Sequence, residues 1–227
     1  MHFLCLHGMG TNSKQVFETQ TAAVRAELGD EHTYDFVEGN IPWPKAPDLG
    51  SLFSDDDDYF SYFDPSDTAS LKQAISNLRS YIQVEGPFDG IMAFSQGASL
   101  AASFLLADQI ARDGDQEGNY SSGFKCAILL SGGYAWSFSS LQKNEWVRAD
   151  KTLESRIDIP TAHVWADNDH LGPDVGTTMA AICAPDMRYS YIHDEGHTIP
   201  SRRSPEKLNE VLKVIRRVIW EGSFGTE

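Results

Sequence analysis

The stretch 86–98 reads Gly-Pro-Phe-Asp-Gly-Ile-Met-Ala-Phe-Ser-Gln-Gly-Ala. Its apolar part, residues 88–94, predicts a buried strand, and the alanine- and leucine-rich residues that follow predict a helix. Ser95 therefore lies where a strand ends and a helix begins. A serine in such a strained turn exposes its hydroxyl, and small residues such as Ala93 and Gly97 let the strand and the helix approach each other. This context favours a nucleophile over the alternative, a serine in an ordinary first helical turn.

The same alternation of apolar runs and helical periodicity continues on both sides of this stretch. Further strands are expected at 3–6, 34–37, 126–130, 161–166 and 188–193, and further helices at 13–28, 68–85 and 205–220. Strands that alternate with helices indicate an α/β protein whose mostly parallel sheet is covered on both faces. A chain of 227 residues fits one such domain over residues 1–227.

A serine hydroxyl needs a general base, which is a histidine held by an acid. His197 lies in the loop Asp-Glu-Gly-His at 194–197, directly after the strand expected at 188–193. This loop belongs to the carboxyl edge of the sheet, where parallel α/β folds place their sites. His193 is the alternative base. Because it ends the strand itself, we expect it to serve packing or a backbone hydrogen bond.

The acid is expected between the serine and the histidine in chain order, on the loop after the strand at 161–166. Two aspartates, Asp167 and Asp169, compete for this role. Asp169 lies further from the strand end and can reach toward the histidine loop, whereas Asp167 is better placed for a turn-forming bond to the backbone. We therefore predict that Asp169 fixes the histidine tautomer and stabilises its charged form.

Acyl transfer also needs donors for the oxygen that becomes negative in the tetrahedral intermediate. The backbone N–H of Gln96 has no intrahelical partner at the start of a helix. The backbone N–H of Met9 is the second candidate, because Met9 lies in the loop His-Gly-Met-Gly at 7–10 after the first strand. His7 is expected to hold this loop rather than to transfer a proton.

The segment after the second strand is less regular. Three prolines, Pro42, Pro44 and Pro47, exclude regular structure there, and residues 52–63 combine four consecutive aspartates with five aromatics. Two interpretations stay open: a solvated loop whose aromatics pack against the core, or a lid over a substrate pocket. Aromatics here and after the strand at 126–130 suggest a pocket for a medium or long apolar acyl group. The candidates are Phe53, Tyr59, Phe60, Tyr62, Phe63, Trp136 and Phe138.

Charge and motifs argue against several classes of function. The formal net charge of -15 disfavours nucleic acid and anionic membranes as partners, because the mean field repels both. The sequence has no paired cysteine spacing, no His-Glu-x-x-His element, no phosphate loop and no dinucleotide fingerprint. We therefore expect no metal and no other cofactor.

The cysteines and the N-terminal residues indicate a compartment. Cys5, Cys126 and Cys183 cannot all pair within the chain, and the first two lie in apolar runs where a thiol acts as a small hydrophobe. Residues 1–8 have too short an apolar run and no basic start for a signal peptide. No segment approaches the roughly 18 apolar residues of a membrane span. A reduced, cytoplasmic protein is the expectation.

Five segments together resemble the fungal-type FSH serine hydrolases over nearly the whole chain. They are Leu-Cys-Leu-His-Gly at 4–8, Gly-Pro-Phe-Asp-Gly at 86–90, Ala-Phe-Ser-Gln-Gly-Ala at 93–98, His163-Val164 with Asp169, and Gly196-His197 with Pro200. This family is similar to the human ovarian-cancer-associated hydrolase, and many fungal members act in polyketide pathways as thioesterases or esterases.

The resemblance implies an α/β-hydrolase fold with a minimal lid. It also assigns Ser95, Asp169 and His197 to a catalytic triad, in agreement with their positions after predicted strands. Ala93 and Ala166 stand where the family has glycine. These two departures remove no catalytic group, and a change in the shape of the pocket is the effect to expect from them.

The leading hypothesis is hydrolysis of a small-molecule acyl ester or thioester, free or bound to a carrier protein, through an acyl-Ser95 intermediate. This reaction would release a polyketide or another acyl chain in fungal secondary metabolism. An acyltransferase or a carbon–carbon bond-forming enzyme would use the same acyl-serine, because pocket shape and dryness select the acceptor. A non-catalytic binding module on the hydrolase fold is the alternative from another class, and the complete set of serine, histidine and acid argues against it.

Two basic residues follow the histidine loop, Arg202 and Arg203. They are expected to form a solvated surface pair, and the alternative is that they attract an anionic carrier or a carboxylate. The sequence leaves the oligomeric state open.

Overall fold

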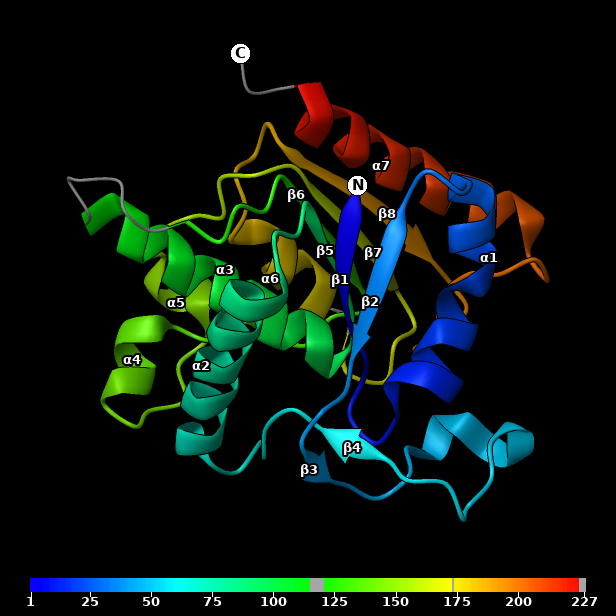
Figure 1. Cartoon of the computed structure of the whole chain (residues 1–227), viewed down its shortest axis with the longest axis horizontal. Coiled ribbons are helices and arrows are strands. Elements are labelled where there is room, and N and C mark those ends of the chain that lie inside the picture. Colours follow the sequence, from blue (N-terminus) through cyan, green and yellow to red (C-terminus); the bar gives the residue numbers. More distant parts are fainter. Residues whose placement is uncertain (115–120, 173, 225–227) are drawn as a thin grey trace.

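The computed structural model describes residues 1–114, 121–172 and 174–224. In this part of the chain six parallel strands form one sheet, in the order β2-β1-β5-β6-β7-β8 (Figure 1). The strands are β1 His2–Leu6, β2 Thr33–Val37, β5 Gly90–Phe94, β6 Cys126–Leu130, β7 Thr161–Ala166 and β8 Arg188–His193. The expected parallel sheet is therefore confirmed, with strand bounds close to those predicted.

Helices cover both faces of this sheet, as expected (Figure 1). The long helices are α1 Glu18–Leu28 and α7 Pro205–Phe224 on one face, and α2 Thr68–Glu85 and α3 Gln96–Gly114 on the other. Leu4 and Leu6 of β1 belong to the core cluster on the α2 and α3 side, whereas Phe3 and Cys5 belong to the cluster on the α1 and α7 side. This alternation explains why the central strands are apolar at every position: both of their faces are buried.

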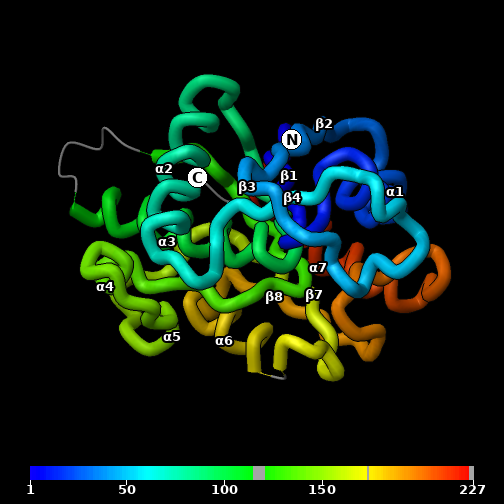
Figure 2. Tube along the Cα trace, turned by 90° about the horizontal axis from the view of Figure 1, so that it is seen from below, coloured from blue at the N-terminus to red at the C-terminus, as the bar shows by residue number. Residues whose placement is uncertain are grey.

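The carboxyl ends of all six strands meet at one edge of the sheet, because the strands run in the same direction. A short antiparallel pair, β3 Ile41–Pro42 and β4 Phe60–Ser61, lies beyond this edge, and Figure 2 shows it from that side. The Gly10 N–H donates to the Phe60 carbonyl (2.9 Å), and the Ala46 N–H donates to the Gly10 carbonyl (2.8 Å). The segment 38–63 is therefore attached to the loop that follows β1.

The proline-rich stretch is more regular than predicted. Pro42 lies in β3, and Pro47 begins 3₁₀ turns over Pro47–Leu52. Proline is tolerated at both places, because a short edge strand does not need its N–H and because the first helical position leaves an N–H unpaired anyway. The prediction that the three prolines exclude regular structure is wrong for these two.

Several short elements are not predicted from the sequence pattern. They are α4 Phe138–Gln142, α5 Ala149–Thr152 and α6 Val175–Ala181, together with a π-helical turn, Ser13–Phe17, that opens the helix predicted at 13–28. None of the three helices is long enough to display a helical period of apolar residues.

The polar segment 113–123 contains residues 115–120, which lie outside the described residues. Before it, α3 continues to Gly114. Within the described part of the chain, no helix has both the length and the apolar character needed to span a bilayer.

Candidate active site

Ser95 occupies the turn between β5 and α3. Its φ of 53° lies in the left-handed region, which residues other than glycine rarely adopt. A Cβ on Gly97 would lie 2.5 Å from the carbonyl oxygens of Leu6 and His7, so only glycine lets α3 begin directly against the end of β1. The Gly97 N–H donates to the His7 carbonyl (3.1 Å). The turn and the loop after β1 are thus joined next to the Ser95 hydroxyl.

The two alanines that replace family glycines are accommodated in the core. Ala93 and Ala166 are both fully buried, Ala93 in β5 and Ala166 at the end of β7. The methyl group of Ala93 packs in the core cluster on the α2 and α3 side of the sheet. Neither substitution prevents its strand from reaching the site edge.

Three side chains from three strand ends meet in one hydrogen-bonded line. Ser95 Oγ lies 2.9 Å from His197 Nε2, and His197 Nδ1 lies 2.8 Å from Asp169 Oδ2. A neutral imidazole carries one proton, so Nδ1–H donates to the carboxylate and Nε2 accepts from the serine hydroxyl. The side chains of Asp169 and His197 are only 7% and 10% exposed, which shields their bond from water. The structure therefore brings together the three residues predicted as nucleophile, base and acid.

Asp169 is held in its ionised form. Burial raises the pKa of this carboxyl, but hydrogen bonds from His197 and from the Leu171 N–H (2.9 Å) outweigh burial and leave the pKa below its usual value. His170 contributes in the same direction, and its Nδ1 lies 3.7 Å from Asp169 Oδ1. A carboxylate in this position keeps the proton of the neutral imidazole on Nδ1 and the Nε2 lone pair free for the serine.

The alternative acid, Asp167, and the alternative base, His193, lie in different environments from Asp169 and His197. Asp167 is exposed, and among the described residues its carboxylate has no hydrogen-bond partner. The turn-forming bond expected of Asp167 is made instead by Asp169, through the Leu171 N–H. His193 is buried at the end of β8, where its Nδ1 accepts from the Glu195 N–H (3.2 Å).

The loop after β1 is fixed around Met9. Gly10 has a φ of 67°, and a Cβ there would lie 2.6 Å from the Pro44 carbonyl oxygen. The Met9 N–H has no hydrogen-bond partner among the described residues. The Gln96 N–H lies at the first position of α3, where it has no partner within the helix. Neither of the two predicted oxyanion donors is therefore used by the backbone of the described residues.

His7 holds this loop from the inside. Its ring is fully buried, with Nδ1 2.7 Å from the Gly8 carbonyl oxygen and Nε2 2.9 Å from both Gly39 N and Glu38 Oε1. Both ring nitrogens are engaged within the protein, so the ring is placed to support the loop and not to contact a substrate.

The Gln96 side chain has a contact that the sequence pattern did not indicate. It is buried, and its Oε1 accepts from the Tyr62 N–H (2.9 Å) while its Nε2 donates to the Phe63 carbonyl (2.8 Å). The residue that offers one oxyanion donor therefore also anchors the segment 38–63. No sequence signal could have revealed this, because the partners are backbone atoms 34 and 33 residues away.

The aromatic pocket candidates are divided between the core and the surface. Tyr59, Tyr62 and Phe63 are at most 7% exposed and belong to hydrophobic clusters. The Tyr62 hydroxyl donates to the Val37 carbonyl (2.7 Å) and accepts from the His7 N–H (2.9 Å). These three residues are therefore part of the packed interior and not walls of an open pocket, because their rings are needed to attach the segment 38–63.

The remaining candidates are half-buried. Phe53 packs against the small cluster that contains Tyr59, and Phe60 lies on β4. Trp136 packs edge-on against Trp146, with ring centroids 4.6 Å apart, and Phe138 begins α4. These side chains retain some exposed surface for contact with a ligand.

Two further groups of side chains have the chemistry to bind an ion. A metal ion could find ligand atoms within 4.8 Å of one another on Asp169, His170 and His197, but Asp169 and His197 already bond to each other. Arg202 and Arg203 are exposed, and Arg202 lies 3.6 Å from Glu27. Arg202 and Arg203 are therefore solvated residues on the surface.

Comparison with known proteins identifies relatives of the whole chain. The family model described as serine hydrolase (FSH1) matches residues 1–207. The esterase FPY3 of Fusarium mangiferae is 38% identical, over 99% of this chain and 100% of its own length. The hydrolase phiM of a fungal species is 28% identical, over 94% of each chain.

Solved structures share the fold at low sequence identity. The Arabidopsis thaliana protein SOBER1 superposes with a TM-score of 0.59 at 18% identity, over 96% of this chain and 99% of its own. The carboxylesterase from Mesorhizobium loti has a TM-score of 0.59 at 15% identity, over 95% of this chain and 88% of its own. The fold is therefore that of the α/β-hydrolases, as the resemblance implied. With its family model matched from residue 1 to 207, the chain belongs to the FSH1 serine hydrolase family.

Proposed function

We propose that this hydrolase cleaves an acyl ester or thioester through an acyl-Ser95 intermediate. The observation that carries the proposal is the line from Ser95 Oγ to His197 Nε2 (2.9 Å) and from His197 Nδ1 to Asp169 Oδ2 (2.8 Å). A serine in hydrogen-bond reach of a histidine that is itself oriented by an acid has the geometry of an activated nucleophile. The printed names of the relatives, esterase and hydrolase, support the same class of reaction.

In the first half-reaction, His197 Nε2 takes the Ser95 proton while Oγ bonds to the acyl carbonyl carbon. The carbonyl oxygen becomes negative and accepts hydrogen bonds from the Met9 and Gln96 N–H groups. When the intermediate collapses, the bond to the alcohol oxygen or thiol sulfur breaks, and His197 gives its proton to that leaving group. In the second half-reaction, His197 deprotonates a water that attacks the acyl carbon, and the proton returns to Ser95.

The acyl group that we propose is a polyketide or another acyl chain of fungal secondary metabolism, presented as a small-molecule ester or as a carrier-bound thioester. The fungal origin of the esterase and hydrolase relatives supports this assignment. A panel of p-nitrophenyl esters and pantetheine thioesters of graded chain length measures the preference through kcat/KM. Partition of the acyl group to added alcohols or amines, instead of water, would favour an acyltransferase.

The covalent step is tested by labelling with a fluorophosphonate probe. The wild type should be labelled, and Ser95→Ala should lose both labelling and turnover while keeping its fold. His197→Ala should lose nearly as much, because the serine then stays protonated. Undiminished labelling of Ser95→Ala would move the nucleophile elsewhere, with the buried Ser131 as the next residue to replace. An unlabelled wild type would instead support a non-catalytic binding module.

A further inference from the structure

Asn168 connects the two loops that carry the acid and the histidine. It lies on the loop after β7, next to Asp169, and its carboxamide reaches across to the loop after β8. Its Nδ2 donates to the Asp194 carbonyl (2.9 Å), and its Oδ1 accepts from the Gly196 N–H (2.8 Å). Gly196 directly precedes His197, so this second bond ends beside the proposed base.

The chemistry of this contact selects a carboxamide. One partner is a carbonyl, which needs a donor, and the other is an N–H, which needs an acceptor. These two partners also fix which way the amide points. A carboxylate of the same shape could serve the Gly196 N–H, but it would turn a negative oxygen toward the Asp194 carbonyl. An apolar side chain would serve neither group.

The histidine loop has other supports besides Asn168. The Glu195 N–H donates to His193 Nδ1 (3.2 Å), the Thr198 hydroxyl donates to the Glu195 carbonyl (3.0 Å), and Lys207 Nζ donates to Glu195 Oε1 (3.1 Å). Gly196 has a left-handed φ of 66°, and the Thr198 N–H donates to the Gly196 carbonyl (2.8 Å). The hydroxyl of Ser131 donates to the Thr198 carbonyl at 3.2 Å. These bonds act within the histidine loop or join it to neighbouring elements, whereas the Asn168 side chain joins it to the loop that carries Asp169.

We propose that Asn168 is a positioning residue, which keeps the loop 194–198 in register so that His197 meets Ser95 and Asp169 at once. The inference rests on the proposed function, because it assigns Asn168 a share in activating Ser95. Without the two bonds, His197 would spend less time aligned with both partners, while the pocket that binds substrate would be unchanged. The expected effect is therefore on the rate of the chemical step and not on KM.

The test compares Asn168→Ala and Asn168→Asp with the wild type by the second-order rate of fluorophosphonate inactivation, and by kcat and KM on one p-nitrophenyl ester. Asn168→Ala should react about tenfold more slowly, since it loses two exposed hydrogen bonds, and KM should stay within about twofold. Asn168→Asp should react at least as slowly as the alanine variant, although its side chain keeps the size of asparagine. Its thermal unfolding midpoint should lie close to that of the wild type.

Asp67→Ala is the matched structural control. Its carboxylate caps α2 by accepting from the Ala69 N–H (2.9 Å), and this contact belongs to neither loop. The control should lower the unfolding midpoint without lowering the inactivation rate. Wild-type rates in Asn168→Asp, or a rate loss in both Asn168 variants that follows their loss of stability, would overturn the positioning role. Failure of the wild type to react with the probe would instead overturn the proposed function.

Discussion

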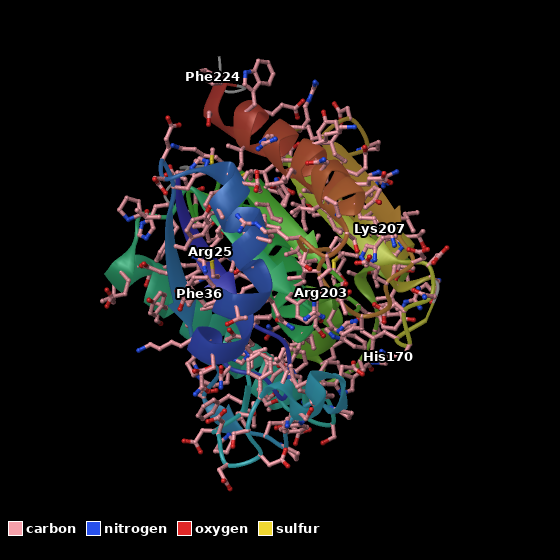
Figure 3. All side chains as sticks on the ribbon, turned by 90° about the vertical axis from the view of Figure 1, so that its right-hand side faces the viewer. Arg25, Phe36, His170, Arg203, Lys207 and Phe224 are labelled. Carbon is pink, nitrogen blue, oxygen red and sulfur yellow. The ribbon has the colours of Figure 1, made fainter. Side chains whose placement is uncertain are left out.

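The two halves of the candidate active site are built differently. The half that offers Met9 and Gln96 is supported by buried side chains, since His7 is fully buried and Gln96 is 7% exposed. The half that offers Asp169 and His197 is joined at its surface by the exposed bonds of Asn168. His170, which follows Asp169 in the chain, has a side chain that is 57% exposed and lies at the periphery of the molecule in Figure 3. Damage to the first half should therefore cost stability and rate together, whereas damage to the second should cost mainly rate.

Replacement of Asp169, the proposed acid, should give the largest difference between the loss of kcat and the loss of stability. Asp169→Asn keeps the shape of the side chain but allows the wrong histidine tautomer, a defect that lowers kcat by about 10⁴-fold in serine proteases. Urea unfolding should show a much smaller change than the kinetics do. Steady-state hydrolysis of one activated ester, together with the unfolding curve, measures both effects on the same preparation.

Asp167→Asn is the control for this prediction. The Asp167 side chain is exposed, so kcat should fall by less than about tenfold and stability by less than about 1 kcal/mol. If Asp167→Asn were the crippled variant and Asp169→Asn nearly normal, the acid would be Asp167, and the roles of Ser95 and His197 would stand.

The buried half is tested by Gln96→Leu. This change leaves the buried Tyr62 N–H without a partner and removes one of the two donors to the Phe63 carbonyl, which keeps its bond from the Ser61 hydroxyl (2.6 Å). The loss should cost about 1–3 kcal/mol of unfolding free energy. The segment 38–63 would loosen and displace the oxyanion donors, so kcat should fall by about 10²-fold. Urea unfolding and ester hydrolysis should both change.

The matched control is Gln73→Leu, because Gln73 is an exposed glutamine on α2. It should change neither quantity appreciably. A Gln96→Leu variant with wild-type stability but a large loss of kcat would show that the two halves do not differ in the way described.

His193, which lies buried at the end of β8 before the histidine loop, should have a smaller, pH-dependent effect on the free energy of unfolding. Burial is the main cause that lowers the pKa of His193 below its usual value. The unfolded chain therefore takes up a proton below about pH 6.5 that the folded chain does not bind. Stability from this residue is complete above about pH 6.5 and is lost as the pH falls toward the folded pKa, by at most about 1.4 kcal/mol per pH unit.

His193→Asn should flatten this part of the pH dependence. Urea unfolding at intervals between pH 5 and 8 should show the difference between wild type and variant becoming smaller as the pH falls. Parallel curves for the two proteins over the whole range would show that His193 takes up its proton equally in the folded and unfolded states.

The sequence predicted those features that follow from strand ends. Ser95, Asp169 and His197 each come just after an apolar run, and parallel strands deliver their carboxyl ends to the same edge. The contacts of Gln96 and Asn168 were not predictable, because their partners are backbone atoms of loops whose paths depend on the folded chain. The sequence suggests Tyr62 and Phe63 as pocket residues, because composition alone does not distinguish a ring that packs inward from one that faces a ligand.

The left-handed backbone of Ser95 implies that the position proposed for catalysis lowers the stability of the folded chain. A side chain at a φ of 53° carries a steric penalty that glycine does not feel. The inactive variant Ser95→Gly should therefore unfold with a free energy about 1 kcal/mol higher than Ser95→Ala, which keeps a Cβ in the same turn. The residue that we propose as the nucleophile is then also one at which glycine would make the fold more stable.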